Sequence, residues 1–412
     1  MAEQLAERST QTGGTNDTIR NLRIHFYGVQ GSGSVFPSRA EREAFQELSD
    51  YELLRQVFND LSERCDGDGH LPCTFDELLG GPPDRRNLLA YRARFHTPEL
   101  RVYGGLTTCV WVETADGHDL VFDCGSGFRN CAKDLQAKWG ARPEREERDV
   151  HIFGSHSHFD HTEGFDQAAL CFDPRNTLRV YGNRQFLRAL DGNLGIFSRR
   201  VAADVRGVHT PLFYAIMPAK FEATEIRDLS AQPPPPDGDD MARHFHDLGE
   251  PVRLGGTSVR AFEVFHPAPC LAYRVEHGGR AFVFCTDHEL RHGPDESHPH
   301  EAASRDAERR LVEHAAGADL LYRDGQYFRA EYDGVQGVGT SGAVPRVDWG
   351  HSCIEDVVDM ACACGVKQTF IGHHDPNREW SERNWVDEAL IRSCKGTGCA
   401  IELARAEAVV DL

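Results

Sequence analysis

The sequence predicts an α/β protein in which short apolar strands alternate with helix-prone segments. Strand-like runs occur at 22–27, 149–153 and 179–182, and the last of them leads into a helix-prone segment that starts at Arg184. Another such run ends in an acidic, glycine-rich turn at 120–127, which is typical of a strand that delivers polar groups to the edge of a sheet. The 412 residues allow two domains, or one large α/β unit that carries insertions.

The sequence also predicts a terminal tail, an insertion and a long loop around the strands. Residues 1–20 are polar and carry both charge signs, which predicts a disordered tail before a single domain at 21–412. Residues 38–100 are charged and helix-prone at first and then rich in Gly and Pro, so they are predicted as an insertion beside the core. Four consecutive prolines make 231–240 an exposed loop, because proline disrupts helices and central strands. Two further strands are expected at 101–109 and 110–113.

Composition narrows the function classes. The formal net charge of -20 argues against binding long nucleic acid, which needs a basic surface, but it does not exclude a small phosphate-bearing substrate. No apolar run reaches the length of a membrane span, and the N-terminus lacks the apolar core of a signal peptide. An odd number of cysteines, 13, without an extracellular spacing favours reduced thiols. We therefore expect a cytoplasmic protein that does not contact membranes.

One short run after the strand at 149–153 is dense in metal-binding side chains. Three histidines and an aspartate stand within six residues: His156, His158, Asp160 and His161. The next two residues, Thr162 and Glu163, look like the first turn of a helix. A turn at the end of a strand can aim several ligands at one point, and nitrogen and oxygen ligands suit zinc, iron or manganese.

In this run the sequence resembles the metallo-β-lactamase superfamily. The resemblance implies a four-layer αββα sandwich and two divalent metal ions, zinc being favoured over manganese or iron. It implies that His156 and His158 hold one metal, and Asp160 and His161 the other. The family pattern also requires a third histidine, a bridging aspartate and a last histidine, which match His266, Asp287 and His373. The neighbouring His374 is the alternative to His373. Asp123, in the acidic glycine turn, matches a residue that supports the metal loop.

The C-terminal third is similar to the phosphodiesterase branch, which includes tRNase Z and bacterial cyclic-nucleotide phosphodiesterases. In this branch a Gly-His-Ser segment carries a histidine that is not a metal ligand, and an upstream carboxylate holds it. The matching residues are His351 and Asp324. The resemblance implies that His351 acts as a general acid oriented by Asp324, and that Asp160 binds a metal and accepts the proton of the nucleophile.

The sequence therefore predicts a binuclear metal-dependent hydrolase that acts on a small phosphodiester such as a cyclic nucleotide. Three alternatives stay open: a tRNase Z-like ribonuclease, a lactonase or thioesterase, and a di-iron redox protein of the same fold. The His288, His292, His298 and His300 cluster is interpreted as a solvated loop, because its spacing is irregular and it contains Pro and Gly. A small-molecule substrate is the expected partner, nucleic acid is disfavoured, and a homodimer is compatible with the sequence.

Overall fold

The computed structural model describes residues 21–96, 101–141, 148–208, 210–235, 241–295, 297–396 and 398–412. The chain divides into two compact units, which are described separately: residues 1–35 with 103–412, and residues 36–102. The predicted tail at 1–20 and the second half of the predicted proline-rich loop, 236–240, lie outside the described residues.

The first sheet of the larger unit has eight strands in the order β15-β1-β2-β3-β4-β5-β6-β7. Its strands are β1 (Leu22–Gly28), β2 (Cys109–Thr114), β3 (Asp119–Phe122), β4 (Arg148–Phe153), β5 (Asn176–Gly182), β6 (Lys220–Arg227), β7 (His244–Asp247) and β15 (Val409–Asp411). The pairs from β15 to β3 are antiparallel, and those from β3 to β7 are parallel. The C-terminal ends of the parallel strands therefore meet at one edge.

The second sheet has seven strands in the order β14-β13-β12-β11-β10-β9-β8. Its strands are β8 (Val252–Leu254), β9 (Thr257–Val264), β10 (Cys270–His277), β11 (Arg280–Cys285), β12 (Leu320–Asp324), β13 (Gln368–Gly372) and β14 (Ala400–Leu403). Strands β8 to β11 pair antiparallel, and β11 to β14 pair parallel. The loops after β11, β12 and β13 consequently leave the sheet at the same edge.

Apolar side chains join the two sheets face to face. Phe122 and Phe153 of the first sheet pack against Tyr273 of the second sheet within one buried cluster, with ring centroids 5.5–5.6 Å apart. Burial of such side chains is the main favourable contribution to folding. This cluster forms the central layer of the core.

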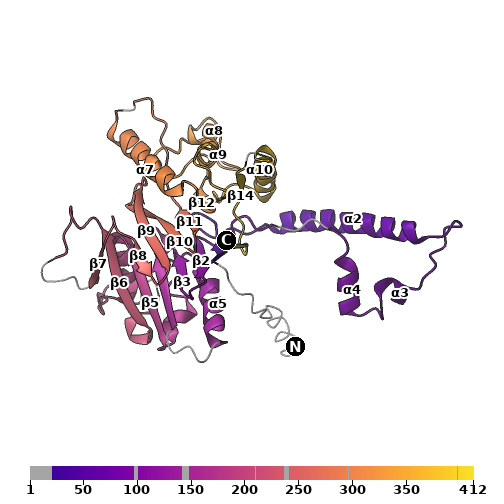
Figure 1. The fold of residues 1–412 in the computed structure, drawn as a ribbon, viewed down its shortest axis with the longest axis horizontal. Coiled ribbons are helices and arrows are strands. Elements are labelled where there is room, and N and C mark those ends of the chain that lie inside the picture. The colour runs from indigo at the N-terminus through magenta and orange to yellow at the C-terminus, as the bar shows by residue number, and fades with distance from the viewer. Residues whose placement is uncertain are drawn as a thin grey trace. The chain divides into compact units, whose positions relative to one another are not determined.

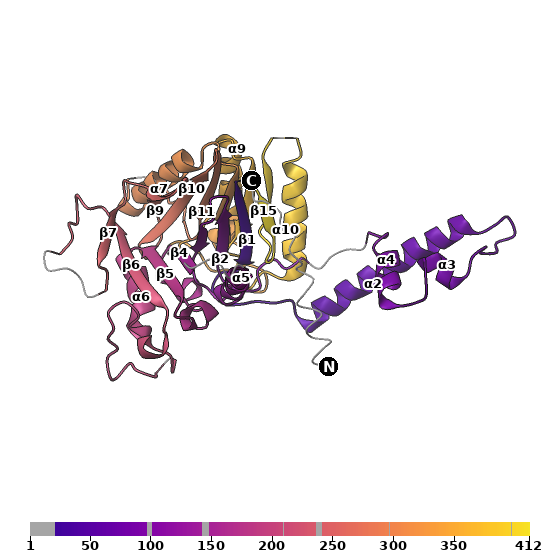
Figure 2. The ribbon, with the colours of Figure 1, turned by 60° about the horizontal axis from the view of Figure 1, so that its bottom comes forward.

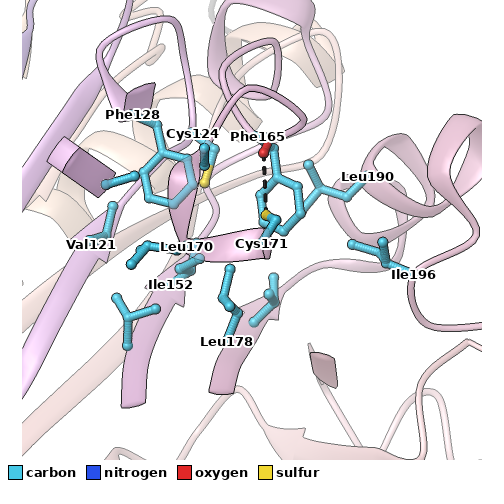
Figure 3. Close-up of a cluster of buried hydrophobic side chains, with 14 of the residues drawn as sticks. Val121, Cys124, Phe128, Ile152, Phe165, Leu170, Cys171, Leu178, Leu190 and Ile196 are labelled. Carbon is cyan, nitrogen blue, oxygen red and sulfur yellow. Dashed lines mark hydrogen bonds between the residues drawn. The ribbon is translucent and has the colours of Figure 1, made fainter. Parts of the chain in front are cut away.

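Helices cover the two outer faces. The helices are α5 (Phe128–Gly140), α6 (Arg184–Leu194), α7 (Pro299–Ala315), α8 (Arg329–Tyr332), α9 (Ile354–Ala363) and α10 (Trp380–Ser393). Helices α5 and α6 cover the first sheet through a buried cluster that includes Val121, Phe128 and Leu190 (Figure 3). Helices α7 and α9 lie on the opposite side of the sandwich (Figures 1 and 2). The predicted αββα sandwich is confirmed.

Two local predictions are wrong. Residues 101–108 form no strand of the first sheet: Gly104 and Gly105 both adopt positive φ, which interrupts an extended chain, so β2 starts at Cys109. No α-helix begins at Thr162. Instead Phe159–His161 form one 3-10 turn, and the chain then returns to the first sheet, where the N–H of Gly164 donates to the carbonyl of Cys124 at 2.8 Å.

The smaller unit, residues 36–102, is helical within its described residues. It contains α2 (Arg39–Arg64), α3 (Phe75–Leu79) and α4 (Arg85–Arg92). The long helix α2 begins at a capping box formed by Ser38 and Glu41, which satisfies free N–H groups of the first turn. In the part of the chain that the structure describes, no helix combines the length and the apolar character that crossing a membrane requires.

Candidate metal centre

The loop after β4 presents its histidines because a buried carboxylate organises it. Asp123, which follows β3 and adopts a positive φ of 60°, accepts the backbone N–H and the hydroxyl of Ser155, both at 2.7 Å. Its Oδ2 also lies 2.7 Å from Nδ1 of His161. That contact fixes the imidazole orientation and leaves Nε2 of His161 facing the centre, as outer carboxylates do at metal sites. Asp123 thus lies behind the loop and bonds to its Ser155 and His161.

The other three candidates come from the second sheet. His266 follows β9, Asp287 follows β11 and His373 follows β13, so all three lie in loops at the ends of strands. The two sheets therefore meet at the site: one supplies the histidine-rich loop and the other supplies the distal residues. Each of these three residues is buried, with at most 9% of its surface exposed.

The candidate ligands form two groups, and one carboxylate of the first group also faces the second. In each group one ligand atom per residue lies within 4.8 Å of the others: His156, His158, His266 and Asp287 in the first, and Asp160, His161 and His373 in the second. Oδ2 of Asp287 lies 3.4 Å from Nε2 of His156, whereas its Oδ1 lies 3.1 Å from Nε2 of His373. Because its two oxygens face different groups, Asp287 is placed to bridge them.

The donor set fits metal binding. Nε2 of His156 is buried and has no hydrogen-bond partner among the described residues, which is costly unless another ligand, such as a cation, takes its lone pair. Imidazole nitrogens and carboxylate oxygens are the donors that zinc and related transition metals take. Either group supplies at least three of these donors, so each of them could hold one ion.

The pKa shifts in the first group favour the protonation states that bind a cation. Burial lowers the pKa of His156, and the neighbouring His161 lowers it further, so its imidazole is neutral near pH 7. Burial alone would raise the pKa of Asp287, but the surrounding His373, His161 and His156 hold it well below its usual range. Metals bind neutral imidazole and ionised carboxylate, which are the forms that these shifts favour.

In the second group, the charge of nearby carboxylates has a larger effect on the pKa of His161 than burial has. Burial alone would lower the pKa of His161, yet Asp287, Asp160 and Asp123 raise it well above its ordinary value. Burial alone would raise the pKa of Asp160, but His161 and His373 lower it. Negative charge from several carboxylates thus converges on one buried imidazole. The same charge attracts a metal cation, which would replace the proton on His161.

Of the adjacent pair after β13, only His373 reaches the centre. Nδ1 of His373 lies 2.7 Å from the side-chain nitrogen of Gln326, so its Nε2 faces the other ligands. His374 points away, with Nε2 3.0 Å from the carbonyl oxygen of Ala404. The segment that follows β1 contacts the centre as well: Ser32 donates its N–H to Asp160 at 2.8 Å.

His351 and Asp324 lie next to the two groups. Nδ1 of His351 is 3.2 Å from Oδ2 of Asp324, which is fully buried at the end of β12. The ring centroid of His351 lies 4.8 Å from that of His373, and one of its nitrogens lies within 4.8 Å of ligand atoms of Asp287 and His373. Burial alone would lower the pKa of His351, but Asp324 and Asp287 raise it, which favours a protonated imidazole.

The sequence interpretation missed two residues directly after Asp287. His288, expected in a solvated loop, is buried, and its Nε2 lies 2.8 Å from a carboxylate oxygen of Glu308 on α7. Glu289 is also fully buried. No local signal indicates this burial, because the partners Glu308 and Gly350 lie 20 and 61 positions further along the chain.

Similarity to known proteins exists at the level of a family and of solved structures. A family profile, the Beta-lactamase superfamily domain, matches residues 118–374. The chain resembles a diphosphatase from the PhnP family, with 15% identity over 95% of this chain and 98% of that chain and a TM-score of 0.47. It resembles the metallo-β-lactamase-fold protein YhfI from Bacillus subtilis, with 14% identity, 95% and 99% coverage and a TM-score of 0.45. It also resembles the short form of human tRNase Z, with 15% identity over 94% of this chain and 98% of that chain and a TM-score of 0.46. No curated protein sequence matches the chain.

Proposed function

We propose that this chain, which belongs to the metallo-β-lactamase superfamily, is a phosphodiesterase that hydrolyses a small phosphodiester with the help of two divalent cations. Family membership and the two donor groups support a metal-dependent hydrolase. The observation that carries the finer proposal is the position of His351, which lies beside both groups while its Nδ1 is held by Asp324.

The cations would be held by the two groups that share Asp287, and zinc is the ion that the histidine-rich donor set favours. When bound, they supply positive charge that neutralises the phosphodiester and lowers the pKa of a water molecule. The chain's part is to hold its donors in fixed positions. Asp123 does this for the loop after β4, and Gln326 does it for His373.

Asp160 is suited to take the proton of the attacking water. Oδ2 of Asp160 accepts the N–H of Ser32 at 2.8 Å, which restricts the rotation of the carboxylate. The same oxygen lies 3.2 Å from Nε2 of His373, so the carboxylate stands at the edge of the second group. An ionised carboxylate in this position can accept a proton as the oxygen attacks phosphorus.

His351 is suited to donate a proton to the leaving oxygen. A phosphodiester with an alkoxide leaving group needs such a donor, because free alkoxide is a poor leaving group. Nδ1 of His351 faces Asp324, which leaves Nε2 as the atom that delivers the proton. Burial alone would lower the pKa of His351, but Asp324 and Asp287 raise it, which favours the protonated form that donation requires.

A cyclic nucleotide is the leading substrate in this proposal. It is a small diester with an alkoxide leaving group, and it needs no extended basic surface. A ribonuclease that grips structured RNA relies on many lysine and arginine contacts to phosphates, whereas this chain carries a formal net charge of -20.

A substrate panel on metal-reconstituted protein tests the proposal. The panel contains cyclic nucleotides, bis(p-nitrophenyl) phosphate, a phosphomonoester, a lactone, a thioester, a β-lactam and a precursor tRNA. We expect turnover of the small diesters. We also expect His351→Ala to lower kcat by about 10²–10⁴-fold on an alkoxide leaving group and far less on p-nitrophenolate, which needs little protonation. Preference for precursor tRNA, or activity confined to lactones, thioesters or β-lactams, would overturn the assignment.

A further inference from the structure

Two chain segments are bonded side by side next to the metal centre. One is 287–291, which begins with the shared ligand Asp287, and the other is 346–352, which carries His351. Leu290 donates its N–H to the hydroxyl of Ser352 at 3.3 Å, and that hydroxyl donates to the carbonyl of His288 at 2.5 Å. The segment that follows a predicted metal ligand therefore supports the segment that carries the predicted proton donor.

Glu289 makes the densest set of these bonds. Its Oε2 accepts the N–H of Gly350 at 2.8 Å, and its Oε1 accepts the N–H of Asp348 at 3.0 Å and the hydroxyl of Tyr332 at 2.5 Å. The side chain is completely buried. A buried carboxylate is costly unless it is well bonded, and bonds to an ionised acceptor are stronger than neutral ones. Glu289 thus holds the backbone N–H groups of Asp348 and Gly350, the two residues that flank Trp349.

The anchored turn has a backbone that needs such support. Asp348 adopts a φ of 67° and Gly350 a φ of 90°, both in the left-handed region. For Asp348 this conformation is strained, and strained conformations persist where surrounding contacts over-determine them. Glu289 binds the N–H of both residues. Arg291 also holds the side chain of Asp348, so loss of the Glu289 bonds loosens the backbone of the turn directly before His351.

We propose that Glu289 is a positioning residue, which clamps the turn at Asp348–Gly350 so that His351 stays between Asp324 and the metal centre. This inference rests on the proposed role of His351 as proton donor. Among the residues that the structure describes, the side chain of Glu289 bonds to Tyr332, Asp348 and Gly350 and to none of the candidate ligands. Its contribution is to the geometry of proton donation.

The test is Glu289→Gln in metal-reconstituted full-length protein. Glutamine keeps the size of the side chain but turns one accepting oxygen into a donating amide, which faces at least one backbone N–H. We expect kcat on an alkoxide diester to fall by about 10- to 100-fold, with little change in KM, in metal content or in the rate on bis(p-nitrophenyl) phosphate. Glu289→Gln combined with His351→Ala should be no slower than His351→Ala alone.

A readout without turnover accompanies the kinetics. Trp349 lies between the two anchored N–H groups and is 49% exposed. Its quenching by acrylamide, obtained as the difference from a Trp349→Phe background, should increase in Glu289→Gln. The matched control is Glu225→Gln, because Glu225 is also a buried glutamate but pairs with Arg184 at 3.2 Å on the first sheet. It should leave both readouts unchanged.

The outcomes separate the two proposals. If His351→Ala shows no dependence on the leaving group, the proposed function fails. If His351→Ala shows that dependence but Glu289→Gln slows both diesters equally, loses metal or adds to the defect of His351→Ala, the positioning role alone is wrong. Unchanged Trp349 quenching with unchanged kcat would also overturn it.

Discussion

Replacing Gly350 with alanine should remove one metal ion from the centre and leave the other. A Cβ atom at this position would lie 2.2 Å from Cδ2 and 2.6 Å from Nε2 of His266. Carbon atoms in ordinary contact are at least 3.4 Å apart, so the imidazole must move by about 1 Å. Zinc binds imidazole nitrogen at about 2.0–2.1 Å with a tolerance of about 0.2 Å, so a displacement of this size disrupts the bond.

The expected loss is selective, because His266 belongs to the group with His156 and His158 and not to the group with Asp160 and His161. The assay is elemental analysis after reconstitution and dialysis, in which metal content should fall from two ions per chain to one. The mutation also places alanine at a φ of 90°, which costs about 1–2 kcal/mol of folding stability irrespective of the metal.

Gly117 provides the control for this backbone cost. It lies in the turn between β2 and β3 at a φ of 91°, and no atom lies within 4 Å of a Cβ built there. Gly117→Ala should therefore lower stability by a similar amount and keep both ions. If Gly350→Ala bound two ions with unchanged affinity, or if Gly117→Ala also lost one, the steric argument would be refuted.

Three further predictions concern single carboxylates. Asp287→Asn should reduce metal content in both groups in the same elemental analysis, whereas Asp324→Asn, which contacts no group directly, should keep the metals and lower kcat. Burial alone would raise the pKa of Glu308, but the charge of Arg323 and the bond with His288 lower it to about 2. A depressed pKa stabilises the fold above the unfolded-state value near 4.5, so Glu308→Gln should cost about 3 kcal/mol at pH 7. In urea titrations this difference should shrink from about pH 4.5 towards pH 2, and a difference that stays constant would contradict it.

The local pattern of apolar and polar residues was sufficient to predict several strands of the first sheet. Strands β1, β3, β4 and β5 were predicted from alternation or from short apolar runs, because such a run must bury at least one face. The failures at 101–108 and at Thr162 share a cause. Gly105, at its positive φ, exchanges backbone bonds with Val35, and Gly164 bonds to Cys124, so in both places a distant partner that no window of neighbouring residues contains helps to fix the backbone.

The candidate site divides in the same way. The resemblance to the metallo-β-lactamase pattern, together with positions near strand ends, implied the seven residues that the structure brings into two groups. The surroundings of His288 and Glu289 were not predictable. Their burial depends on partners far along the chain, such as Glu308 and Gly350, and the local spacing is that of a solvated loop. Hydrogen bonds between residues that lie 20 and 61 positions apart in the chain form only in the assembled fold.

The contribution of both sheets to one centre has a consequence for the order of assembly. His161 and His373 approach each other to 3.2 Å although 212 positions separate them in the chain. A chain that emerges from the ribosome exposes the loop after β4 long before β13 exists, and domains of this size form through partly folded intermediates. Such an intermediate holds four of the seven candidate donors and lacks Asp287, the carboxylate that faces both groups. We therefore expect tight capture of metal to be a late event in biosynthesis, and a stalled or truncated chain to retain ions poorly compared with a finished molecule.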